Sequence, residues 1–305
     1  MMHWMKKSIG FLLFVICSVA IYQKVLHDIA WNHFWESMHR QLAAIAVYQW
    51  LVLFILFCFN FLLEAFKWQS VIRKVKNISL YESLESVFVG QAFAFFTPNR
   101  IGEYAGRTLS LDNRYKVRGM AQMAWASYAQ LLVTLLLGAV ALWLNIVFYP
   151  ILQGPLLILL KCVAPLIGLL ALLLFFYERH WAGWFSFLNK VQIAKPIKIK
   201  ILSLSTIRYG IFILQYIWVG QLLHLDIATH YLVLSLAILF LCLSVLPTIS
   251  VTELVVRGQL LLLLLAPFCK DQLMIVSLST FIWGVNIMLP AIIGACLLLR
   301  YRINQ

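Results

Sequence analysis

The stretch FTPNRIGEYAGR, residues 96–107, decides how the whole chain is interpreted, and LPTISVTELVVR, residues 246–257, is a weaker copy of it. Each copy has a proline, then a glutamate, and then an arginine four residues after the glutamate. Glu103 and Glu253 lie 150 positions apart, and Arg107 and Arg257 lie the same 150 positions apart. This shared register predicts that one half of the chain repeats the other.

Each copy predicts a broken helix with an ion pair near the break. Positions four apart lie on one face of a helix, so Glu103 is expected to reach Arg107, and Glu253 to reach Arg257. Proline tolerates the first turn of a helix and disfavours helix in the residue before it, so Pro98 and Pro247 are expected to start new helices.

The composition predicts an all-α, polytopic membrane protein. Of the 305 residues, 63% are hydrophobic and 11% are charged, and the mean hydropathy is +0.92, which excludes a soluble globular domain. No long polar linker interrupts the apolar runs, so residues 1–305 are interpreted as a single membrane domain. The net charge of +13 gathers in short loops and does not indicate a nucleic-acid partner.

Six apolar runs are long enough to span a bilayer, which needs about 20 residues. They cover residues 8–26, 43–67, 119–147, 154–177, 201–223 and 272–299. The first run follows two lysines like a signal peptide, but without a clear cleavage site it is interpreted as an uncleaved helix. Residues 84–96 and 98–110 are too short to span and predict a re-entrant hairpin. Residues 227–246 and 250–266 predict either a second hairpin or two full crossings.

With either interpretation of 227–266, each half of the chain has an odd number of crossings. The halves, residues 8–147 and 151–299, are therefore expected to have opposite orientations in the membrane. Such inverted repeats are common in secondary transporters.

Loop charge predicts the orientation. Sixteen basic residues fall on one side of this topology, namely Lys6, Lys7, Lys67, Arg73, Lys74, Lys76, Arg114, Lys116, Arg118, Arg179, Lys190, Lys195, Lys198, Lys200, Arg300 and Arg302. Only Lys24, Arg40 and Lys270 fall on the other side. Basic loops stay in the cytoplasm, so both termini are expected there, and the first hairpin is expected to start from the cytoplasmic side.

The two motifs supply the candidate substrate-binding residues, which are Pro98, Arg100, Gly102, Glu103, Arg107, Pro247, Glu253 and Arg257. A helix that restarts at bilayer depth offers free N–H groups to an anion, and arginine suits phosphate. Charges at this depth are costly and usually face a protein interior or a water-filled cavity. The structural alternative, in which the Glu–Arg pairs only hold the hairpin tips in place, remains open.

Other polar residues have simpler interpretations. Lys161 and Arg208 are expected to extend toward the membrane surface, and Glu64 with Lys67 to form an interfacial ion pair. The six cysteines and seven histidines lack metal-ligand spacing, so neither a metal nor another cofactor is predicted. No H-E-x-x-H, G-x-S-x-G or P-loop motif occurs, so enzymatic activity is not expected.

The sequence Pro98-Asn99-Arg100-Ile101-Gly102-Glu103, with Pro247, Glu253 and Arg257, resembles the transmembrane region of bacterial lysylphosphatidylglycerol synthases and of related stand-alone, flippase-like membrane proteins. The resemblance covers essentially the whole chain and implies a location in the bacterial cytoplasmic membrane. In that family the membrane region is implicated in moving modified phospholipid between leaflets, and a separate domain attaches the amino acid. No such synthase domain is recognised here, so aminoacyl transfer is not expected. Ser250-Val251-Thr252 stands where the family often has glycines.

Three functions remain open at this point. The first is a lipid flippase with a polar site for an anionic or zwitterionic headgroup near the midplane. The second is an intramembrane enzyme, or an accessory subunit of an aminoacyl or glycosyl transferase that modifies lipids. The third is a structural scaffold in which the charges serve folding alone. The expected partners are membrane lipids and, in the second case, a lipid-modifying transferase.

Overall fold

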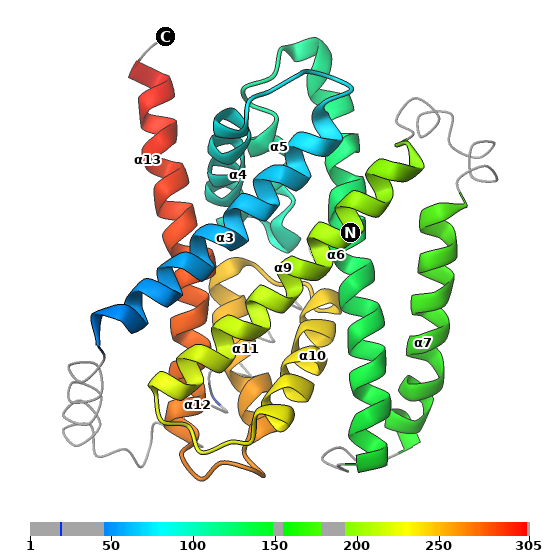
Figure 1. Cartoon of the computed structure of the whole chain (residues 1–305), viewed down its shortest axis with the longest axis vertical. Helices are drawn as coiled ribbons and strands as arrows, with labels where there is room; N and C mark the ends of the chain where they lie inside the picture. The colour runs from blue at the N-terminus through cyan, green and yellow to red at the C-terminus, as the bar shows by residue number, and fades with distance from the viewer. Residues whose placement is uncertain (1–18, 20–45, 149–154, 178–192, 304–305) are drawn as a thin grey trace.

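The computed structural model describes residues 19, 46–148, 155–177 and 193–303, and all regular secondary structure in these residues is helical (Figure 1). This confirms the all-α class. The expected first span, 8–26, lies outside the described residues apart from Val19. The elements are α3 (Val47–Ile72), α4 (Leu80–Phe95), the 3₁₀ turn η2 (Pro98–Arg100), α5 (Gly102–Arg107), α6 (Asn113–Phe148), α7 (Pro155–Phe176), α9 (Lys195–Leu222), α10 (Thr229–Val245), α11 (Ser250–Leu265), α12 (Gln272–Trp283), the π-helical turn η4 (Gly284–Met288) and α13 (Leu289–Ile303).

Three helices in the described part of the chain are long and apolar enough to cross a membrane. They cover Val47–Ile72, Asn113–Leu144 and Gln272–Leu299, and they match the spans expected at 43–67, 119–147 and 272–299. The spans expected at 154–177 and 201–223 also form helices, α7 and α9. Large apolar side chains such as Phe54, Trp143 and Leu166 are exposed on these helices, as is typical of a membrane protein.

The first hairpin has less regular geometry than its sequence predicts. Asn99 and Arg100 have φ angles of 49° and 57°, in the left-handed region that non-glycine residues rarely adopt. Because left-handed residues cannot continue an α-helix, Pro98 starts only the short turn η2, and the helix restarts at Gly102. The second arm therefore covers 102–107, and the expectation of a helix over 98–110 was wrong.

The tips of the two hairpins meet in the middle of the molecule. The Asn99 N–H donates to the Thr248 carbonyl over 2.9 Å, and the Thr248 N–H donates to Asn99 Oδ1 over 3.2 Å. Figure 1 shows α4 and α5 on one side of this junction and α10 and α11 on the other. At about 1.5 Å per residue, α10 is roughly 25 Å long and α6 roughly twice that. Residues 227–266 therefore form two helices, α10 and α11, that meet at the second tip.

Each hairpin packs against the last long helix of the other half of the sequence. The first arm of the first hairpin, α4, lies along α13, and the corresponding arm α10 lies along α6. The helices α3 and α9, which precede the two hairpins, pack against each other and run side by side diagonally across the view in Figure 1. This arrangement places the polar tips between the two hydrophobic cores, one built around α10–α12 and the other around α3.

Close packing of the first hairpin provides a stability prediction. A Cβ atom on Gly106 would lie 2.8 Å from the Gly90 Cα, so Gly106→Ala is expected to destabilise the protein by about 1–3 kcal/mol. A Cβ on Gly210 in α9 meets nothing within 4 Å, so Gly210→Ala is the matched control and is expected to be neutral or slightly stabilising. Thermal unfolding of the detergent-purified variants measures both. Equal melting temperatures for the two variants would contradict this packing account.

Candidate functional site

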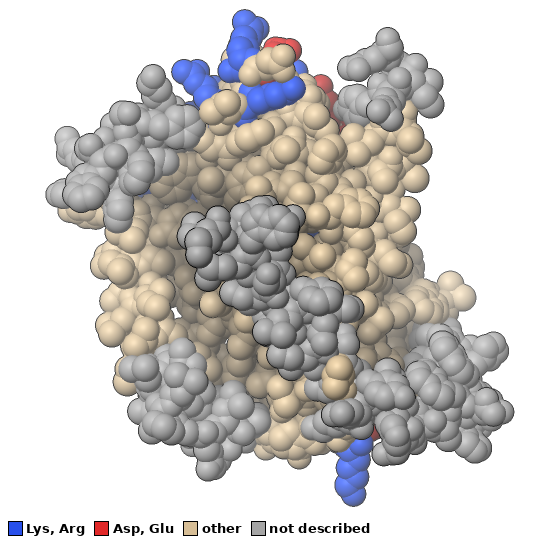
Figure 2. Space-filling view, turned by 180° about the vertical axis from the view of Figure 1, so that it is seen from behind, with Lys and Arg blue, Asp and Glu red and all other residues tan. Residues whose placement is uncertain are grey.

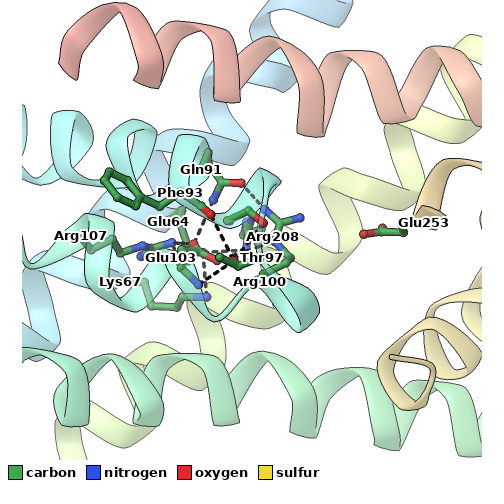
Figure 3. A network of polar contacts seen from close by, with 12 residues as sticks. Glu64, Lys67, Gln91, Phe93, Thr97, Arg100, Glu103, Arg107, Arg208 and Glu253 are labelled. Carbon is green, nitrogen blue, oxygen red and sulfur yellow. Dashed lines mark hydrogen bonds and ion pairs between the residues drawn. The ribbon is translucent and has the colours of Figure 1, made fainter. Parts of the chain in front are cut away.

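Glu64, in the middle of α3, is the centre of a buried network of charges. Its carboxylate lies 2.8 Å from Lys67 Nζ, 2.8 Å from Arg107 Nη2 and 2.7 Å from Arg208 Nη1. The Glu64 residue is only 4% exposed, so these contacts replace the water that a carboxylate would otherwise need. Because Arg107 is on α5 and Arg208 on α9, the network joins three elements that are distant in the sequence (Figure 3).

Glu103 extends this network to the hairpin tip. It accepts a hydrogen bond from Arg107, as the four-residue spacing predicts, and another from Gln91 Nε2 over 2.9 Å. Arg100 Nε lies 3.8 Å from the Glu103 carboxylate, and Arg100 Nη2 donates to Gln91 Oε1. We call the six charged residues Glu64, Lys67, Arg100, Glu103, Arg107 and Arg208 the tip cluster.

Glu64 and Lys67 form the expected ion pair, but both side chains are buried, at 5% and 3% exposure, so the pair is not interfacial. The expectation for Arg208 was wrong, because its side chain turns inward to Glu64 and is only 15% exposed. Their charges are compensated inside the protein instead. The sequence contained a signal for this, since a charge within an apolar run is costly unless it has a partner. The Lys161 side chain lies outside the described residues.

The second motif forms a smaller, electrically neutral pair. Glu253 accepts a hydrogen bond from Arg257, and Arg257 Nη1 also donates to the Tyr216 hydroxyl over 2.9 Å. Both charged side chains are largely buried, at 12% and 11% exposure. In Figure 3, Glu253 stands apart from the tip cluster, and its carboxylate points toward the cluster.

A cavity of about 450 Å³ separates the tip cluster from the second pair. Its charged lining residues are Glu64, Lys67, Arg100, Glu103, Arg208, Glu253 and Arg257, and its polar lining residues include Gln91, Asn99, Ser127, Gln130, Ser244, Thr248 and Asn286. The residues that line it from α9 and α10 include Tyr209, Phe212 and Phe240. The cavity can therefore hold a charged group against its polar walls, and its aromatic wall offers an apolar surface beside that group.

Four of the eight candidate residues line this cavity, namely Arg100, Glu103, Glu253 and Arg257. Arg107 lies behind them, 1% exposed, and holds Glu64 and Glu103 in place. Pro98 and Pro247 shape the two tips, and neither they nor Gly102 are among the lining residues. Gly102 is a packing residue, since a Cβ atom there would clash with the Phe93 carbonyl.

The restarted helix of the first hairpin does not offer all the free N–H groups that its sequence suggests. The Gly102 N–H donates to Thr97 Oγ1 over 2.8 Å, and Thr97 Oγ1 in turn donates to the Phe93 carbonyl over 3.1 Å. Thr97 thus joins the end of α4 to the start of α5. The positive charge at this tip therefore comes from the arginine side chains rather than from the helix terminus.

A polar path that sequence reasoning missed leads from the tip cluster into α12–α13. Arg208 Nε donates to Asn60 Oδ1 over 2.8 Å, and Asn60 Nδ2 donates to Asn286 Oδ1 over 3.1 Å. Asn286 lies in the π-helical turn η4, and such turns are often found at functional sites. Asparagines spaced 226 positions apart leave no periodic signal in the sequence.

In the part of the chain that the structure describes, no group of three or more His, Cys, Asp or Glu side chains is arranged to hold a metal ion. In comparisons with known proteins, no family model matches the chain, and no curated protein is a significant match.

Proposed function

We propose that the chain is a lipid translocator that moves a phospholipid, or another lipid-linked headgroup, between the two leaflets of a membrane. The observation that carries this proposal is the charged cavity at the junction of two hairpin tips, midway along helices whose outer faces are apolar. A headgroup would occupy this cavity while its acyl chains stay in the bilayer.

The proposed topology has six full crossings, two re-entrant hairpins and inverted halves, and the reciprocal packing of α4 on α13 and α10 on α6 supports it. Figure 2 shows lysine and arginine side chains gathered at one end of the molecule. That end carries the loop after α3, with Arg73 and Lys74 exposed, and the start of α6, with Arg114 exposed (Figure 1). We place this end, with both termini, in the cytoplasm of a bacterial cell and the chain in its cytoplasmic membrane.

The proposed orientation predicts which residues an impermeant thiol reagent reaches in intact cells. On a background without native cysteines, a cysteine at Asn113, which starts α6, is expected to be protected. A cysteine at Gln272, which starts α12 at the opposite end of the molecule, is expected to be labelled. Permeabilised cells, in which both sites react, provide the control. Labelling of Asn113→Cys with protection of Gln272→Cys in intact cells would reverse the orientation.

The residues of the site have separate roles in this proposal. Arg100, Arg208 and Arg257 would bind the phosphate, because a guanidinium presents several donors to phosphate oxygens. Glu103 and Glu253 would balance these charges or receive a cationic part of the headgroup. Arg107 would hold Glu103 in position from behind, and Glu64 would hold Arg208 in position. The resemblance to flippase-like membrane proteins is consistent with this division of roles.

A double substitution tests whether the ion pair of the first motif serves transport. Glu103→Gln with Arg107→Gln removes both charges, keeps approximate volume, and leaves Glu64 with Lys67 and Arg208 as partners. The variant is therefore expected to fold and insert but to lose most of its lipid transfer in reconstituted vesicles, because Glu103 no longer holds Arg100 in place. Unchanged transfer by the folded variant would assign the pair a structural role alone.

A further inference from the structure

The charges around the cavity do not balance. The tip cluster and the second pair together hold five cationic side chains, Lys67, Arg100, Arg107, Arg208 and Arg257, and three anionic ones, Glu64, Glu103 and Glu253. With all of these side chains ionised, the networks carry a surplus of two positive charges. An uncompensated charge in a largely buried site is unfavourable, so the surplus favours an anionic ligand.

The surplus lies entirely on one side of the cavity. The second pair is neutral, whereas the tip cluster has four cations and two anions. Within the tip cluster, Arg107 is fully buried and Lys67 nearly so, with Glu64 beside both. Arg100 and Arg208 line the cavity and keep 33% and 15% of their side chains exposed. These two arginines therefore present the surplus charge to a ligand.

Both arginines also have N–H donors that the described residues do not use. Arg208 uses Nε for Asn60 and Nη1 for Glu64, and Arg100 uses Nη2 for Gln91, with Nε near Glu103. In the described part of the chain, neither Arg100 Nη1 nor Arg208 Nη2 donates a hydrogen bond to another protein group. Arg100 is held at this edge by a left-handed backbone with φ of 57°, a strained conformation of the kind that clusters at ligand sites.

We propose that the cavity selects a phosphate dianion, meaning a phosphate monoester or a diphosphate diester, over the singly charged phosphodiester of ordinary phospholipids. The proposal rests on the translocator function and names its substrate class. The dianion binds between Arg100 and Arg208, which are contributed by the first hairpin and by α9 and so by both halves of the chain. A phosphate monoester has a second pKa near 6, so it carries close to two negative charges at pH 8, whereas a phosphodiester carries one.

The experiment measures binding of lipids to the purified full chain by native mass spectrometry at pH 8, with phosphatidic acid as the monoester and phosphatidylglycerol as the diester of matched acyl chains. Phosphatidic acid is expected to bind more tightly by on the order of tenfold, since one more charge contacts the arginines. Arg100→Asn removes one cation with a residue that tolerates the left-handed backbone, and is expected to bring the two lipids to near-equal affinity. Arg100→Lys keeps the charge and is expected to keep the preference.

Glycerol phosphate, a soluble monoester, distinguishes the two sources of such a group. If glycerol phosphate displaces phosphatidic acid only at a large excess, the ligand is a lipid. Displacement at equal concentration would support a phosphate dianion as the ligand, but it would contradict the proposal that this dianion belongs to a lipid. Equal binding of phosphatidic acid and phosphatidylglycerol by the unmodified chain would overturn dianion selection and leave the translocator proposal intact. If neither lipid binds and neither crosses vesicles that contain the folded chain, both proposals fail.

Discussion

A disulfide between the two hairpin tips is expected to stop lipid transfer. The main chains of Asn99 and Thr248 are hydrogen-bonded to each other, so cysteines at these two positions are expected to form a cross-link on oxidation. Alternating access moves one part of a transporter relative to another around the site, and the tips must separate for a headgroup to pass. The oxidised Asn99→Cys, Thr248→Cys variant should therefore transfer lipid no faster than protein-free vesicles.

Reduction of the same sample controls for damage caused by the substitutions, and transfer should return with the reductant. A second control places the two thiols at Asn113 and Gln272, which lie at opposite ends of the molecule and cannot be joined within one chain (Figure 1). All six native cysteines are replaced in both variants. If the tips are fully cross-linked, as shown by mass spectrometry, and lipid still moves at the unmodified rate, the hairpins do not separate during transport.

Loss of the Glu64 charge is expected to have the largest effect on stability. Glu64→Gln leaves Lys67, Arg107 and Arg208 around a neutral side chain, and breaking a buried ion pair in this way costs about 3–5 kcal/mol. The melting temperature of the detergent-purified protein should fall on the order of 10 °C. A bound anionic lipid should recover part of the loss, because it compensates the cations that Glu64 no longer neutralises.

Glu85→Gln is the matched control for this prediction. Glu85 lies on α4, is only partly buried, and forms no ion pair with any described residue. The same chemical change there is expected to shift the melting temperature by little, as for most surface substitutions. Equal shifts for Glu64→Gln and Glu85→Gln would show that the buried network does not stabilise the fold.

The repeated motif predicted most of the architecture of the site. The 150-residue register located both Glu–Arg pairs, and both pairs form. In the described part of the chain, the apolar runs predicted the ends of the long helices to within six residues. The break at residues 96–101 was predicted from Pro98, but its length was not. Asn99 and Arg100 adopt left-handed angles, which non-glycine residues rarely do, and Asn99 contacts Thr248, which is distant in the sequence.

The residues around the motif were harder to predict because their partners are distant in the sequence. Glu64 and Arg208 lie 144 positions apart, and each alone has the pattern of a charge that reaches a membrane surface. Packing of α3 against α9 brings them together and turns two separate charges into one network. A two-fold relation between residues 8–147 and 151–299 stays a prediction, which superposition of the halves will test through the positions of Glu103 and Glu253.

Transfer of a labelled lipid by the purified, unmodified chain tests the central claim most directly. Phosphatidic acid or phosphatidylglycerol with a fluorescent acyl chain is built into both leaflets of vesicles, and dithionite, which does not cross the membrane, is added outside. With the chain present, inner-leaflet label should reach the outside and be quenched, while protein-free vesicles keep it protected. If vesicles that contain the folded chain protect both lipids as well as protein-free vesicles do, the chain is not a translocator of these phospholipids.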